Sequence, residues 1–97
     1  MAETHPVTAL PWYRRSDYAA LLKLFSDSDE MPATYDAWLD GAQRTEMQLQ
    51  KAGVGVTRIW IQPAPFAAWC QERNISPDQW ARLTFADEAA RDIFTQC

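Results

Sequence analysis

Several residue types and patterns that would point to a membrane protein or a metalloprotein are scarce or missing. No apolar run approaches the roughly 18–20 residues that span a bilayer. The first residues show no basic segment followed by an apolar stretch, so neither a transmembrane helix nor a signal peptide is expected. The 97 residues include one histidine, His5, and two cysteines, Cys70 and Cys97, with no Cys-x-x-Cys pair. We therefore expect no metal site and no cofactor.

Positive charge is also in short supply. Nine Lys and Arg residues stand against 13 Asp and Glu residues, for a net charge of -4. This balance disfavours nucleic acid or an anionic membrane surface as the main partner. Much of the excess lies in the run Asp27-Ser28-Asp29-Glu30, which we interpret as a solvated acidic loop. Two cysteines in a short chain are typical of free thiols in a reducing compartment, so we expect a cytoplasmic protein.

What remains is the composition of a globular domain, with 47% hydrophobic and 12% aromatic residues. The length favours a single small domain over residues 1–97, in which residues 1–11 form a flexible arm or an edge strand. The spacing of apolar residues predicts four helices, over about residues 17–25, 35–52, 65–73 and 77–94.

The last predicted helix has the clearest start signal. Ser76-Pro77-Asp78-Gln79 combines an N-cap serine, a proline in the first turn and a glutamine at the third position, which together form a capping box. The apolar residues that follow at helical spacing are predicted to face the core: Trp80, Leu83, Ala86, Ala90, Ile93 and Phe94.

One segment, Val54–Ile61, has the composition of a strand, because it is rich in β-branched residues and ends before a proline. Its backbone N–H and C=O groups need a partner, since burying them unpaired costs roughly 1–3 kcal/mol each. One candidate is Val7–Leu10, whose flanking prolines are typical of an edge strand. The other is the same strand of a second copy, antiparallel about a two-fold axis at Thr57. The expected fold class is therefore α+β and mostly helical, with about four helices packed on a small antiparallel β ribbon that dimerisation can complete.

The segment Trp12-Tyr13-Arg14-Arg15 is the most suggestive local cluster. Two aromatic residues followed by two arginines can stack on a planar ligand or hold a phosphate or carboxylate. The same pattern also fits a segment whose aromatic side chains fill the core and whose arginines balance nearby acids. Cys70 has the same two interpretations, a reactive thiol or a small buried hydrophobic residue.

Arg58 and Trp60 share one face of the predicted strand. Arginine and tryptophan are enriched at the energetic centres of protein interfaces, so these two residues are candidate contacts if no other element covers them.

Part of the chain resembles a family of small uncharacterised bacterial proteins. The resemblance covers residues 31–70 and rests on Met31-Pro32-Ala33-Thr34-Tyr35, Trp38, Gly53, Val56, Arg58, Ile61-Gln62-Pro63, Phe66 and Trp69-Cys70. It implies a bacterial, cytosolic setting and a compact α+β domain. No activity is known for the family, so it implies no catalytic residues.

The function expected from these observations is a non-enzymatic protein-interaction or regulatory module that acts as a homodimer and can also bind another protein. Arg58, Trp60 and the acidic loop are its predicted contact surface. The alternative is a small-molecule-binding protein or a minor enzyme with a pocket formed by Trp12, Tyr13, Arg14, Arg15 and Cys70. The sequence shows no catalytic set, which favours the first hypothesis, and it names neither the partner nor the biological process.

Overall fold

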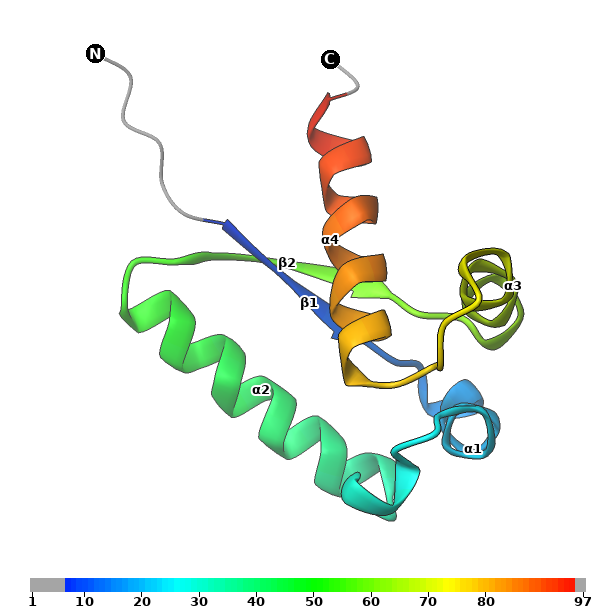
Figure 1. Ribbon diagram of the computed structural model, residues 1–97. Helices are drawn as coiled ribbons and strands as arrows, with labels where there is room; N and C mark the ends of the chain where they lie inside the picture. The colour runs from blue at the N-terminus through cyan, green and yellow to red at the C-terminus, as the bar shows by residue number, and fades with distance from the viewer. Residues whose placement is uncertain (1–6, 96–97) are drawn as a thin grey trace.

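The fold consists of a two-stranded sheet with helices on both faces and two further helices beyond its end (Figure 1). The computed structural model describes residues 7–95, so His5 and Cys97 lie outside it. The α+β class and the four helices are confirmed. In chain order the elements are β1 (Val7–Trp12), α1 (Arg15–Leu24), the 3-10 turn η1 (Ser28–Glu30), α2 (Tyr35–Lys51), β2 (Gly55–Trp60), α3 (Pro63–Arg73) and α4 (Gln79–Thr95).

The two strands are parallel, so the predicted antiparallel ribbon is wrong. Their register runs from Val7 beside Gly55 to Trp12 beside Trp60. The reason lies in the connection, because α1, η1 and α2 carry the chain from the end of β1 back to the starting edge of the sheet. Such a crossover gives a parallel pair, whereas a short turn would have given an antiparallel one.

β1 is longer than the expected Val7–Leu10 and includes Pro11. The N–H of Ile61 donates to the carbonyl of Trp12 at 2.9 Å, so the backbone groups of Trp12 face β2. Because these groups alternate in direction along a strand, those of Pro11 face away from β2. A proline is tolerated there, since its missing N–H would have pointed to the open edge of the sheet.

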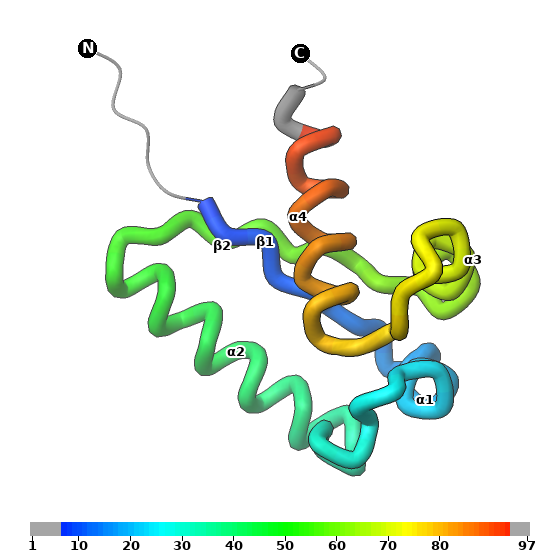
Figure 2. Tube along the Cα trace, in the orientation of Figure 1, coloured from blue at the N-terminus to red at the C-terminus, as the bar shows by residue number. Residues whose placement is uncertain are grey.

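The sheet lies between α2 and α4 (Figures 1 and 2). On one face, Ala9 and Ile59 pack against Ala86 and Ala90 of α4. On the other face, the Trp12 ring meets Trp38 of α2 edge to face, with ring centroids 5.3 Å apart. Alternate side chains of the strands thus pack against opposite helices, because successive side chains of a strand point to opposite faces of the sheet.

The main core lies beyond the sheet, where α1, α3 and the start of α4 meet. Its buried members are hydrophobic residues from these helices and from the segments that adjoin them: Tyr13, Tyr18, Leu21, Phe25, Ile61, Phe66, Cys70 and Ala81. The Tyr18 hydroxyl donates to the Pro32 carbonyl at 2.6 Å, which fixes the loop before α2 on this core.

The helix starts differ in how well they follow the sequence signals. At α2 the N–H of Ala37 donates to the Thr34 hydroxyl at 3.2 Å, which is an N-cap bond. At α4 the predicted cap at Ser76 is wrong, because the N–H of Ala81 donates to the Asp78 carboxylate at 3.0 Å and the helix begins at Gln79. Asp78 is therefore the residue that caps this helix.

The face that α4 buries also differs from the prediction. Ala86 and Ala90 are buried as expected, but Trp80, Leu83 and Ile93 are exposed. The buried stripe instead combines small alanines with Arg82, so the large apolar residues point to the flank of the helix. The Phe94 side chain lies outside the part of the chain that the structure describes.

Between Val7 and Thr95, no helix has both the length and the apolar character needed to cross a membrane.

Candidate functional site

The four residues at 12–15 do not surround a common pocket. Trp12 is buried between the sheet and α2, and Tyr13 is buried in the main core. Arg14 lies over the ring of Trp60, 5.4 Å from its centroid. Arg15 forms an exposed ion pair with Asp36 at 2.6 Å. The sequence neighbours thus point to different surroundings, and of these four only Tyr13 lines one of the cavities described below.

Arg58 joins α2 to the sheet. Its Nε and Nη2 atoms each donate to Glu46 at 2.7 Å, and its guanidinium lies 4.0 Å from the centroid of the Trp12 ring. This hydrogen bonding lowers the pKa of the Glu46 carboxyl. Both contacts of the Arg58 guanidinium are thus within the chain, while its side chain remains 42% exposed. Its neighbour Trp60 is 46% exposed and is partly covered by Arg14.

Cys70 lies within the main core and is buried. Burial raises the pKa of its thiol, with a further contribution from Asp78. A buried thiol that stays protonated is a poor nucleophile. The structure therefore fits the interpretation of Cys70 as a packing residue.

A groove lies along the free edge of β1, where α4 flanks the strand. The described residues contain only the strands β1 and β2, so no strand lies beside the outer edge of β1. The groove has a volume of about 420 Å³, and its lining is Val7, Thr8, Ala9, Trp80, Leu83, Thr84, Asp87 and Arg91. We call it the β1-edge groove.

Large apolar side chains gather at the β1-edge groove without cover. Trp80 is 78% exposed, Val7 53% and Leu83 40%. Below them, the alternation along β1 leaves the N–H and C=O groups of Ala9 facing the open edge. Unpaired backbone groups beside exposed apolar side chains are a template for adding another strand.

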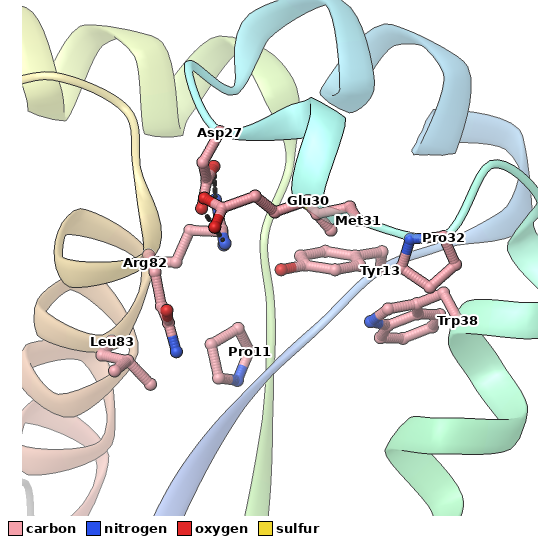
Figure 3. Close-up of a pocket in the computed structure, with 10 residues that line it drawn as sticks. Pro11, Tyr13, Asp27, Glu30, Met31, Pro32, Trp38, Arg82 and Leu83 are labelled. Carbon is pink, nitrogen blue, oxygen red and sulfur yellow. Dashed lines mark hydrogen bonds and ion pairs between the residues drawn. The ribbon is translucent and has the colours of Figure 1, made fainter.

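A second hollow lies at the other end of β1, between the η1 loop and the starts of α2 and α4 (Figure 3). Its volume is about 460 Å³, and its lining is Pro11, Tyr13, Asp27, Glu30, Met31, Pro32, Trp38, Gln79, Arg82 and Leu83. We call it the Tyr13–Trp38 cavity, after the two rings that form its wall with centroids 4.6 Å apart.

A buried ion pair forms part of the lining of the Tyr13–Trp38 cavity. The two terminal nitrogens of Arg82 donate to the two carboxylate oxygens of Asp27 at 2.8 and 2.9 Å. Arg82 is only 7% exposed and its guanidinium lies 4.4 Å from the centroid of the Phe25 ring. Hydrogen bonding to Arg82 lowers the pKa of Asp27, while burial raises the pKa of Tyr13 to about 12. Tyr13 therefore remains a neutral phenol at any physiological pH.

Trp80, Leu83 and Arg82 were not among the sequence-predicted site residues. The spacing of Trp80 and Leu83 predicts a place in the core, and a single sequence does not separate an inward apolar stripe from one that the fold leaves exposed. Arg82 pairs with a residue 55 positions away, which local spacing does not reveal.

Comparison of the chain with protein-family models, with curated proteins and with solved structures finds no match. The resemblance of residues 31–70 to small bacterial proteins thus stays an interpretation of the sequence and carries no functional argument. The function has to be inferred from the surfaces themselves.

Proposed function

We propose that the protein is a non-enzymatic interaction module that forms a homodimer by pairing the open edge of β1 with the same edge of a second copy. The observation that carries the proposal is the exposure of Trp80 and Leu83 directly beside the unpaired backbone of β1. Parallel sheets are usually buried and rarely stop at two strands. A pairing of two copies would give a four-stranded sheet with β2 at both outer positions.

A two-fold axis at Ala9 gives a register in which the outward-facing backbone groups match. Ala9 then lies opposite Ala9 of the partner and exchanges two hydrogen bonds with it. Val7 lies opposite Pro11 of the partner, where the Val7 N–H donates to the Pro11 carbonyl. Because Pro11 has no N–H, the Val7 carbonyl opposite it receives no donor, so only the Val7 N–H is bonded in each such pair. The association then depends on the Ala9 pair and on the apolar side chains of α4.

The same axis brings the two α4 helices together. Each α4 covers both strands of its own sheet, so two copies joined at β1 would hold these helices about two strand spacings apart. That distance is roughly 10 Å, which is the usual separation of packed helices. Trp80 and Leu83 would fill the space between them, and both would lose their contact with water.

The charges of the β1-edge groove are compatible with a second copy. Pro11 and Gln79 line one cavity while Val7 and Arg91 line the other, so α4 runs antiparallel to β1 (Figure 1). The axis would therefore bring Arg91 and Asp87, which form an ion pair within the chain, toward Trp80 of the partner. An arginine over an indole is favourable, and a charged rim around an apolar centre is typical of interfaces.

This proposal moves the contact surface from Arg58 and Trp60, as the sequence suggested, to the opposite edge of the sheet. We also propose a cytoplasmic location, which the buried free thiol of Cys70 supports.

Sedimentation velocity over protein concentrations from about 0.1 to 500 μM tests the proposal. We expect a concentration-dependent monomer–dimer equilibrium. Trp80→Ser should raise the dimer dissociation constant at least about 100-fold, because each dimer loses two apolar anchors of about 2 kcal/mol or more. Trp60→Ser on the other edge is the matched control and should change it less than about threefold. A protein that stays monomeric throughout, or a dimer that only Trp60→Ser weakens, would refute the assignment.

A further inference from the structure

The Tyr13–Trp38 cavity has the features of a binding site for an organic cation. We propose that it binds a protonated amine or guanidinium group carried on a flat apolar body. The inference concerns a different surface from the proposed dimer contact and does not depend on dimerisation.

The wall of the cavity suits a flat apolar group. The half-buried Trp38 ring rests on the buried ring of Tyr13, with a tilt of 41° between them, and Met31, Pro32 and Leu83 complete the apolar lining. The volume of about 460 Å³ falls within the range of roughly 300–1,000 Å³ that small-molecule sites occupy. The cavity is therefore large enough for a single aromatic or aliphatic ligand, and Trp38 offers it a ring to stack against.

The charges around the cavity select the sign of the ligand. Two carboxylates, Asp27 and Glu30, line it with a single guanidinium, that of Arg82. Both terminal nitrogens of Arg82 already bind Asp27, so this pair is internally neutral. Within residues 7–95 no ion pair links the carboxylate of Glu30 to another side chain. The cavity thus carries one uncompensated negative charge.

The position of Glu30 supports the same sign. Its side chain extends toward the Asp27–Arg82 pair, and the phenol of Tyr13 points to the same place (Figure 3). A cation bound there would meet the carboxylate of Glu30 on one side and the lining around Trp38 on another, and a carboxylate beside an aromatic ring is a combination that recognises amines and guanidinium groups. An anion would have to displace Asp27 from Arg82 or lie beside Glu30, and both are unfavourable.

Three compounds with the same phenyl body test the sign directly: phenethylamine, 2-phenylethanol and 3-phenylpropionate, which are cationic, neutral and anionic at pH 7. Titrations followed by amide and indole N–H chemical shifts report where each compound binds. We expect phenethylamine to shift the Trp38 indole signal and those of residues 27–32, with an affinity at least tenfold above that of 2-phenylethanol. 3-Phenylpropionate should bind most weakly.

Glu30→Gln should lower the affinity for phenethylamine at least fivefold and leave that for 2-phenylethanol unchanged. Asp29→Asn is the matched control, because Asp29 is an exposed acid of the same turn that does not line the cavity. It should change either affinity less than twofold. Equal binding of amine and alcohol, a preference for the carboxylate, an equal effect of both variants, or no shift near Trp38 with any compound would each overturn the proposal.

Discussion

The Asp27–Arg82 pair joins the loop after α1 to α4, and its contribution to the free energy of unfolding can be measured. Asp27 lies between α1 and η1, whereas Arg82 lies in the first turns of α4, so the pair links segments 55 positions apart. The arginine is almost fully buried, and its carboxylate partner is 17% exposed. We predict that Asp27→Ala destabilises the protein far more than the loss of a surface ion pair would.

The magnitude follows from what the substitution leaves behind. An exposed ion pair contributes about 0–1 kcal/mol, whereas removing one partner of a buried pair costs about 3–5 kcal/mol, because a charge stays buried without compensation. Glu30 lines the same cavity and can partly replace the missing carboxylate, so we take the lower limit. The expected loss for Asp27→Ala is therefore about 3 kcal/mol.

Urea denaturation of four proteins measures this loss: the wild type, Asp27→Ala, Arg82→Met and the double variant. The methionine keeps the apolar stem of Arg82 over Phe25 but removes the charge. Because replacing both partners of a buried pair is often nearly neutral, the double variant should be more stable than Asp27→Ala alone. A loss below about 1 kcal/mol for Asp27→Ala, or single-variant losses that simply add in the double variant, would refute the reasoning.

Three further outcomes are expected. Hydrogen bonding to Arg82 holds the pKa of Asp27 below the unfolded value of about 3.9, so its stabilising contribution is present above that pH and lost as the pH falls through the folded pKa; urea midpoints from pH 6 to pH 2 should fall further in the wild type than in Asp27→Ala, which keeps only the losses from other carboxylates such as Glu46. Ala9→Pro, which removes an outward N–H of β1, should abolish dimerisation, whereas Val56→Pro, which does the same on the outer edge of β2, should preserve it in sedimentation velocity. Cys70 in a Cys97→Ser background should react with a maleimide only after denaturation, as measured by mass spectrometry, and rapid labelling of the native protein would contradict its burial.

The helices could be predicted from the sequence because the information that specifies them is local. Thr34 caps α2 from the position just before the helix, and the apolar spacing of Tyr18, Leu21 and Phe25 identifies the buried face of α1. The direction of the strands could not be predicted in the same way. It depends on where α1 and α2 return the chain, which is a property of their packing and not of any residue within Gly55–Trp60.

The orientation of α4 was predicted wrongly for a related reason. Trp80 and Leu83 form an apolar stripe with Ala86 and Ala90, and hydrophobicity alone favours burying the largest members. The structure buries Ala81 and Arg82 instead. A buried arginine is acceptable only because Asp27 neutralises it, and this partner is too distant in the sequence for a helical pattern to reveal it.

The small residues of α4 explain why the large ones are left exposed. Ala86 and Ala90 let the helix lie close to Ile59 and Ala9, so that α4 covers the narrow two-stranded sheet with little side-chain volume. Trp80 and Leu83 are then left exposed in the β1-edge groove, beside Val7, Thr8 and Ala9. A helix that only had to cover β1 and β2 would have no need of large apolar residues at this flank, and their exposure to water is unfavourable. A second copy paired along β1 would cover them and satisfy the free backbone groups of Ala9 at the same time. For this reason we expect Ala9→Pro and Trp80→Ser to weaken the same association, although one changes the backbone and the other a side chain.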